Sequence, residues 1–534
     1  MGGVLKFSEK QLEALFLGIV FILFLWLSVG PMFDNRIIHP FPVGYLAQDS
    51  FFHEALSEYV YKEGSYTKTP EFLTEGIENI VAHQPPMLYY LVASVAYLTR
   101  VPVHDTLVLL TALTTILCCM VVYFLIKSIN KHIALLALPL MVFMFSFPFN
   151  AALFWGQYLF VFGMFFMLVT IHFILSRNYL AAAATMLATV YVHTSEFLYL
   201  IPLAGGLAVI HLLKKHKSDA FMIGGAVLAT VVLSSPYLFM FAKTWMGSSP
   251  AFKLNIIRET THFNAAAVQF SHFGIVQFFI FMGIVVLLSP LMKKKIEHYF
   301  VWGFLLLIGM SNYLNQWRAF QFRFFFPLTF SLFFGVALYL PLYVLVKQKS
   351  IVYYVVSALL IVGFVAVVYE KQPLASAVFQ ELWDSLGYVQ QAGEPGQKLL
   401  VVENPLINND KILWRSLMIT HKLPKTEMDA MVASGDLSRV FPMKRTNAPM
   451  CEQARFADAG VFRLQYSNEL FTMCTNRTLF NASLCSYDYI LLVLAQVPAE
   501  YGQYWQSFVD SSSFEIVKQK NGVFVLQNNG TGVC

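Results

Sequence analysis

The chain has 534 residues, of which 57% are hydrophobic and only 13% are charged, and its mean hydropathy is +0.60. Soluble domains carry about 25% charged residues, so this composition excludes an ordinary water-soluble protein and indicates one embedded in a lipid bilayer. The net charge of +5 is modest and no basic tract resembles a nucleic-acid surface, so no nucleic-acid partner is expected.

The first predicted element is a membrane anchor. Lys6 and Lys10 precede an apolar run over residues 12–29. A cleaved signal peptide would have an apolar region of only about 7–15 residues, followed by small residues at a cleavage site. The longer run therefore favours an uncleaved signal-anchor helix.

Further apolar runs predict a polytopic α-helical membrane protein. A spanning helix needs about 20 predominantly apolar residues, and windows of that size give about eleven spans. We expect them near residues 11–30, 106–126, 132–148, 151–175, 179–194, 196–213, 219–241, 272–292, 298–314, 322–346 and 350–369.

Basic residues in the short loops predict the orientation of these spans, because cytoplasmic loops carry an excess of Lys and Arg. With the N-terminus inside, every compact basic cluster falls in a cytoplasmic loop, and an odd number of spans places the C-terminal region outside. The clusters are Lys127/Lys131, Arg177, Lys214/Lys215/Lys217, residues 293–295 and Lys347/Lys349.

Residues 85–98 (PPMLYYLVASVAYL) form an apolar stretch that is too short to span a bilayer. Counting them as a span would reverse every later loop and put the lysines at 214–217 outside. We therefore expect a re-entrant or interfacial helix within a large first outer loop, residues 31–105.

The sequence divides into a membrane domain, residues 1–370, and an extracytoplasmic α/β domain, residues 371–534. After Glu370 no apolar run of membrane length appears. Residues 398–403 and 487–494 have the composition of short buried strands. Residues 514–519 and 523–527 flank a Lys-Asn-Gly turn, which predicts a β-hairpin.

Cysteines and glycosylation motifs agree with an outer location for this domain. Cys118 and Cys119 lie in a predicted span, where we interpret them as apolar filler. The other four cysteines allow two disulfides in three pairings: Cys451, Cys474, Cys485 and Cys534. Three Asn-x-Ser/Thr motifs, at Asn476, Asn481 and Asn529, are consistent with a glycoprotein.

Ionisable groups at membrane depth are costly and mark function by default. Asp49 and His53 lie one helical turn apart in the first outer loop, so their side chains share a helix face. This spacing suits an acid/base pair or a shared divalent metal ion. The structural alternative is a helix N-cap at Asp49 with an unrelated histidine.

Other candidate groups lie on the same predicted side. Glu196 stands beside His193 in a short polar break between two spans, where a buried acid needs a partner. His83 precedes the Pro-Pro turn, where it positions a substrate or only shapes the turn. Arg318 and Arg323 suit a lipid-linked phosphate, although arginines near span ends also extend to the interface.

These features together resemble the GT-C superfamily of membrane glycosyltransferases, which use polyprenyl-phosphate-linked sugars. The segment HQPPMLYYL is similar to the (H/K)PPLLYWL element of the mannosyltransferase and aminoarabinose-transferase branches. The resemblance implies that Asp49 is the first-loop acid, catalytic or metal-binding. It also implies that Arg318 or Arg323 holds the carrier phosphate.

Two departures from the family pattern restrict the assignment. Asp49 is followed by Ser50 and not by a second acid, which leaves the need for a divalent metal open. The WWD-type signature of oligosaccharyltransferases is missing from the C-terminal region, which argues against en bloc glycan transfer to asparagine.

The resemblance predicts a glycosyltransferase that moves a sugar from a polyprenyl-phosphate-linked donor to an acceptor glycan, lipid or protein. The reaction would take place on the extracytoplasmic side, in the periplasm, at the cell exterior or in the ER lumen. Asp49 would be the general base, assisted by His53 or Glu196. The alternatives are a non-catalytic carrier-binding subunit of the same fold and a secondary transporter, which usually shows internal repeats and ionisable groups at half depth.

Overall fold

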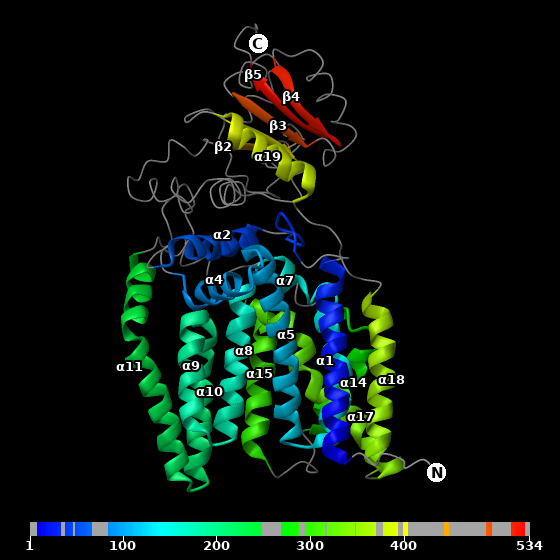
Figure 1. Cartoon of the computed structure of the whole chain (residues 1–534). Helices are drawn as coiled ribbons and strands as arrows, with labels where there is room; N and C mark the ends of the chain where they lie inside the picture. The colour runs from blue at the N-terminus through cyan, green and yellow to red at the C-terminus, as the bar shows by residue number, and fades with distance from the viewer. Residues whose placement is uncertain are drawn as a thin grey trace. The chain divides into compact units, whose positions relative to one another are not determined.

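The structure is a computed structural model (Figure 1). It describes residues 8–33, 38–45, 48–66, 84–247, 269–287, 295–314, 318–347, 349–369, 378–393, 399–403, 443–447, 488–493 and 514–528. The chain divides into two compact units. We call Met1–Ile38 with Val81–Leu374 the helical unit, and His39–Ile80 with Ala375–Cys534 the mixed unit.

The helical unit is a bundle of apolar helices (Figure 1). Its elements are α1 Glu9–Phe33, α4 Met87–Thr99, α5 Val103–Lys127, α6 Lys131–Met141, η1 Val142–Phe145, α7 Ala151–Phe154, α8 Tyr158–Leu175, α9 Tyr179–Val192, α10 Thr194–Leu213, α11 Lys217–Gly247, α14 Val276–Leu287, α15 Ile296–Leu314, η3 Arg318–Phe325, α16 Phe326–Thr329, α17 Ser331–Val346 and α18 Ser350–Tyr369.

Among the described residues, seven helical stretches are long and apolar enough to cross a membrane, and all seven coincide with predicted spans. Five shorter apolar helices accompany them, including α4 at the position of the expected interfacial helix. The prediction of an integral membrane protein rich in apolar helices is therefore confirmed. The stretch expected as one helix over 322–346 is interrupted, because η3 and α16 precede α17.

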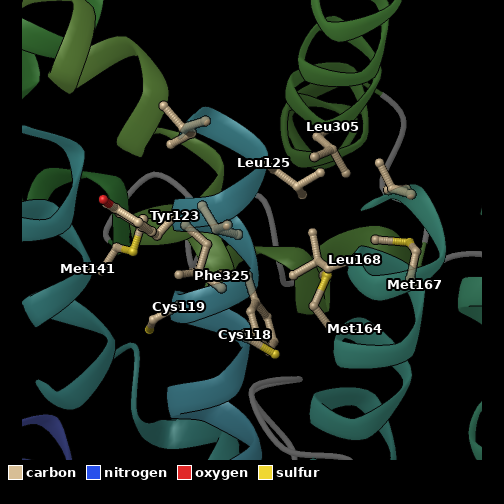
Figure 2. Close-up of a cluster of buried hydrophobic side chains, with 14 of the residues drawn as sticks. Cys118, Cys119, Tyr123, Leu125, Met141, Met164, Met167, Leu168, Leu305 and Phe325 are labelled. Atoms are coloured by element: carbon tan, nitrogen blue, oxygen red, sulfur yellow. The ribbon is translucent and has the colours of Figure 1, made fainter. Parts of the chain in front are cut away.

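The core of the helical unit forms where α5, α6, α8 and α15 meet (Figure 2). Leu125, Met164 and Leu305 pack there as buried side chains from three of these helices. Helices that are apolar on every side can pack against other helices and against lipid. Cys118 and Cys119 lie in this core as free thiols and are fully buried.

Two glycines set the close packing around α17. A Cβ on Gly335 would lie 2.6 Å from the backbone oxygen of Ile133 on α6. A Cβ on Gly283 of α14 would lie 1.8 Å from the backbone oxygen of Phe333 on α17. Small residues let helices in a membrane approach this closely, so these two positions fix the α6–α17–α14 packing.

Ion pairs and hydrogen bonds gather the basic loops at one end of the helical unit, which we call the basic end. Lys127 of α5 pairs with Glu13 of α1 at 2.5 Å, and Lys214 of α10 pairs with Glu297 of α15 at 2.7 Å. Arg177, after α8, pairs with Asp219 of α11 at 3.5 Å. Helices α5, α8 and α10 therefore all begin at the opposite end of the bundle.

The mixed unit contains a five-stranded sheet in the order β2-β1-β3-β5-β4. Strands β1, β2 and β3 pair in parallel, and β5 pairs antiparallel with β3 and β4. Its elements are α2 Gln48–Glu63, α19 Gln380–Ala392, β1 Leu399–Glu403, β2 Met443–Asn447, β3 Tyr489–Val493, β4 Phe514–Lys520 and β5 Val523–Asn528. Helix α19 packs against β3 and β5.

The predicted strands at 398–403 and 487–494 and the predicted hairpin are present as β1, β3 and β4–β5. Asn521 and Gly522 turn the hairpin with φ of 46° and 79°, the left-handed geometry that an Asn-Gly pair favours. The four cysteines of this region and its three glycosylation motifs lie outside the described residues, and the division at residue 370 stays a prediction.

Candidate functional site

An aromatic cluster lies at the end of the helical unit opposite the basic end, close to the predicted residue His193. Phe160, in the first turn of α8, contacts the ring of His193 with a centroid distance of 6.1 Å. It also contacts Phe322 and Phe325 of η3 at 5.5 and 5.2 Å. Tyr199 of α10 packs on Phe322 at 5.3 Å. One cluster thus joins α8, α10, η3 and the α9–α10 break.

The break between α9 and α10 is made by a single extended residue. Helix α9 ends at Val192 and α10 begins at Thr194, while His193 between them has φ of −155° and ψ of 109°. The polar run at 191–196 thus turns the chain, and it places His193 and Glu196 about one helical turn apart.

The structure brings the predicted residues Glu196 and His193 together as a pair. The imidazole Nδ1–H of His193 donates to Oε2 of Glu196. The glutamate is fully buried, whereas the histidine side chain is 22% exposed. The other carboxylate oxygen, Oε1, is buried and makes no hydrogen bond within the described part of the chain.

Gly163 of α8 makes room for this pair. A Cβ at position 163 would lie 2.6 Å from Oε2 of Glu196 and 2.9 Å from Cβ of His193. Real Cβ atoms do not approach other atoms as closely as either of these distances. Position 163 must therefore be glycine if the Glu196 carboxylate is to lie where it does.

Arg323 is a buried residue of η3. In the sequence it lies between Phe322 and Phe325, two residues of the aromatic cluster. Its exposure is 5%, and its guanidinium lies over the ring of Phe324 at 4.5 Å. An arginine that merely extends to the membrane interface keeps its charged head in water, and burial does not fit that alternative. Arg318 begins the same 3₁₀ helix, five residues earlier.

Asp49 and His53 lie in the mixed unit, on α2. Asp49 is in the first turn of the helix and half-buried, and His53 is buried one turn later. The hydroxyl of Ser57 donates to the backbone oxygen of His53 at 2.8 Å. Both predicted side chains are thus held by an ordered helix, whereas His83 lies outside the described residues.

A divalent metal ion would find two donors on this helix face. Catalytic metal sites use three or more protein ligands or add substrate oxygens. Among the described residues no three His, Cys, Asp or Glu side chains come together as a metal-binding group. Asp49 and His53 therefore form part of a ligand set at most.

Two buried acidic side chains, those of Glu54 and Asp105, were not predicted as candidates from the sequence. Glu54 of α2 is fully buried directly after His53. Asp105, in the first turn of α5, is buried and pairs with His104 at 3.6 Å. An acid that follows Pro102 at a helix start looks like ordinary capping, so only its burial marks it as unusual.

A small cavity of about 20 Å³ adjoins the cluster through Phe325. Its lining is mainly apolar, with three polar side chains from separate segments, Ser28, Thr115 and Asn150. The buried Oδ1 of Asn150 makes no hydrogen bond within the described residues. A cavity of this size accommodates about one water molecule.

The fold is similar to that of solved membrane glycosyltransferases. One is the archaeal oligosaccharyltransferase AglB from Archaeoglobus fulgidus, in complex with an inhibitory peptide and a dolichol-phosphate. It matches at a TM-score of 0.54 and 13% identity, over 98% of this chain and 75% of that chain. Another is the arabinofuranosyltransferase AftD from Mycobacteria, at a TM-score of 0.52 and 14% identity, over 98% and 40% of the two chains.

A third structure, ArnT from Cupriavidus metallidurans bound to undecaprenyl phosphate, aligns over 98% of this chain and 99% of its own at 11% identity and a TM-score of 0.49. No protein-family model and no curated protein matches the sequence. The fold assignment rests on AglB and AftD. The chain shares the overall fold of these two glycosyltransferases, which agrees with the GT-C-like fold expected from its motifs.

Proposed function

We propose that the chain is a glycosyltransferase that moves a sugar from a polyprenyl-phosphate-linked donor to an acceptor. The observation that carries this proposal is a buried arginine, Arg323, on η3, the short helix that packs through Phe322 and Phe325 on Phe160. Phe160 also contacts His193 of the His193–Glu196 pair. The fold supports it, because AglB with its dolichol-phosphate and AftD share the same architecture. A guanidinium held away from water binds a phosphate strongly.

We place the reaction on the extracytoplasmic face of an integral membrane protein with about eleven spans and a cytoplasmic N-terminus. The basic loops gather at one end of the helical unit, which is the arrangement that the positive-inside rule favours for the cytoplasmic side. The candidate groups of the helical unit, His193, Glu196 and Arg323, lie at the other end of that unit. Residues 371–534 then form an extracytoplasmic domain, and the acceptor is a glycan, lipid or protein.

In the proposed mechanism, Asp49 accepts the proton of an acceptor hydroxyl, and His53 assists it. The hydroxyl oxygen attacks the anomeric carbon while the bond from that carbon to the carrier phosphate oxygen breaks. The carrier phosphate leaves with the electron pair, and Arg318 and Arg323 stabilise its charge. His83 and His193 position the substrates. One base and a good leaving group need no covalent intermediate, so we expect inversion.

A divalent ion held by Asp49 and His53 would supply additional positive charge to the leaving phosphate. Asp49 and His53 of α2 would provide two of its ligands. Metal dependence is tested by adding a chelator to the transfer assay and restoring the ion.

The test uses purified full-length protein in detergent with polyprenyl-phosphate sugars. Transfer or release of the sugar supports the glycosyltransferase. Binding without turnover supports the carrier-binding subunit, and sugar flux into vesicles without transfer supports a transporter. Either of these two results contradicts the proposed function.

Asp49→Asn should lower the transfer rate by about 10²–10⁴-fold, because the amide cannot accept the proton. Glu58→Gln is the matched control, since Glu58 lies on the same helix and pairs with Lys62 at 3.4 Å. Normal turnover in Asp49→Asn, with a chain that folds normally, ends the assignment of the base.

Arg323→Glu should raise the donor KM sharply, because it replaces the proposed phosphate ligand with a like charge. Arg177→Glu, at the basic end, is the control and should leave the donor KM unchanged. An unaltered donor KM in Arg323→Glu removes this arginine from the mechanism.

A further inference from the structure

We propose that His193 contacts the phosphate of the lipid-linked donor and that Glu196 acts only through His193, as a positioning residue. This inference rests on the proposed function. It gives Glu196 a positioning role in place of the catalytic role expected from the sequence. It assigns Nε2 of His193 as the contacting atom.

Exposure separates the two side chains. The carboxylate of Glu196 is fully buried, and α8 closes over it at Gly163. The imidazole of His193 is 22% exposed, at the point where α9 stops and α10 starts. A substrate that enters from the end of the bundle therefore meets the imidazole, and the carboxylate stays behind it.

Hydrogen bonding then decides which imidazole atom is available. Nδ1–H donates to Oε2 of Glu196, so the carboxylate fixes the ring orientation. Carboxylates orient histidines in this way at metal and catalytic sites, and they leave Nε2 for the ligand. Glu196 thus aims Nε2 away from the buried side of the pair.

The surroundings favour a phosphate as the ligand. The ring of Phe160 contacts His193 and also Phe322 and Phe325 of η3, the short helix that carries the buried Arg323. The hydroxyl of Thr194, next to His193, is buried without a hydrogen-bond partner in the described part of the chain. Among the parts of the proposed donor, the phosphate is the one that accepts hydrogen bonds most strongly from imidazole and guanidinium groups.

The test compares two amides at position 193. The amide nitrogen of glutamine stands near the place of Nε2, and that of asparagine near the place of Nδ1. His193→Gln keeps an outward donor and loses the bond to Glu196, whereas His193→Asn does the reverse. We expect His193→Asn to raise the donor KM by about ten- to a hundredfold, since a hydrogen bond to a charged group is lost, and His193→Gln to raise it less. The acceptor KM should not change in either variant.

Glu196 is tested by rescue. Glu196→Gln keeps an oxygen that accepts from Nδ1–H and should retain most of the donor affinity, whereas Glu196→Leu loses this bond and keeps Nε2, so it should behave like His193→Gln. Gly163→Ala should reproduce the defect, because its Cβ displaces the carboxylate. Gly205→Ala is the control on α10, where a Cβ meets no atom within 4 Å.

The order of the donor KM values in the two His193 variants tests the inference, and the activity of the wild-type protein tests the proposed function. If His193→Asn binds the donor normally and His193→Gln does not, the histidine only pairs with Glu196, and the inference is overturned while the enzyme remains. If wild-type protein transfers no sugar and binds no polyprenyl phosphate, the proposed function itself fails. Each variant is first checked for a monodisperse peak and the wild-type Tm.

Discussion

Two buried glutamates at opposite ends of the helical unit have different surroundings. At the basic end, Glu13 is 6% exposed and accepts hydrogen bonds from Tyr123 at 2.8 Å and from Lys127 at 2.5 Å, with Lys131 at 3.4 Å. At the other end, Glu196 is more deeply buried and has one hydrogen-bond partner, His193, in the described part of the chain.

The number of hydrogen-bond partners of a buried carboxylate therefore helps to separate structural from functional acids in an apolar bundle. A buried carboxylate whose oxygens are all satisfied by neighbouring helices ties those helices together. Glu13 joins α1 to α5 and α6 in this way. A buried carboxylate with an unsatisfied oxygen costs free energy, and such a cost is retained where a site needs it.

The largest expected effect on stability is at the basic end. Glu13→Leu leaves Lys127 and the Tyr123 hydroxyl without their acceptor, so the free energy of unfolding should fall by about 3 kcal/mol. Thermal unfolding in detergent measures it. Glu9→Leu is the control, because Glu9 is 56% exposed and its pair with Lys131 should contribute no more than about 1 kcal/mol. Equal losses in the two variants contradict the proposed importance of burial.

The corresponding change at the other end should have the opposite character. Glu196→Leu removes a desolvated carboxylate together with its unsatisfied oxygen. We expect a free energy of unfolding equal to that of the wild type or higher by about 1 kcal/mol. The same melting experiment tests this, and a loss as large as that of Glu13→Leu breaks the comparison.

A smaller effect is expected at the cavity beside the cluster. Asn150→Leu replaces an amide whose Oδ1 has no hydrogen bond among the described residues and whose Nδ2 is 3.4 Å from the oxygen of Phe145. Stability should change by less than about 1 kcal/mol. A larger loss would indicate that an ordered water joins Asn150 to Ser28 and Thr115.

The smallest effect concerns an exposed pair in the mixed unit. The hydrogen bond that Asn521 donates to Glu381 at 2.7 Å lowers the pKa of that carboxyl below its ordinary value of 4.5. A lowered folded-state pKa stabilises the fold above pH 4.5, and this contribution is lost as the pH falls through the lowered pKa. The Tm difference between wild type and Glu381→Gln should therefore shrink below pH 4.5. A difference independent of pH argues against a contribution from the carboxylate charge.

Local sequence signals predicted much of the architecture. Long apolar runs located α1, α5 and α18, because length and hydropathy are sufficient to identify a span. Residues 514–527 predicted the hairpin, because Asn521 and Gly522 adopt the turn that the pattern requires. The break before α17 was not predicted, since residues 322–346 are apolar throughout and only packing divides them.

The candidate site was predicted in its residues and not in its arrangement. The pattern at 191–196 drew attention to Glu196 and His193, but which of the two is buried depends on Gly163, thirty residues earlier in the chain. Asp105 and Glu54 were missed because their burial is produced by distant segments. The sequence around a polar residue near a span end does not show whether its side chain has all its hydrogen-bond partners in the folded protein.

The most direct test of this account is a structure of the full-length protein with a bound polyprenyl phosphate. We expect the phosphate to lie within hydrogen-bonding distance of the Arg323 guanidinium and of Nε2 of His193, at the end of the helical unit opposite the basic end. A phosphate held by Lys127 and Lys131, or one distant from both predicted groups, would contradict it.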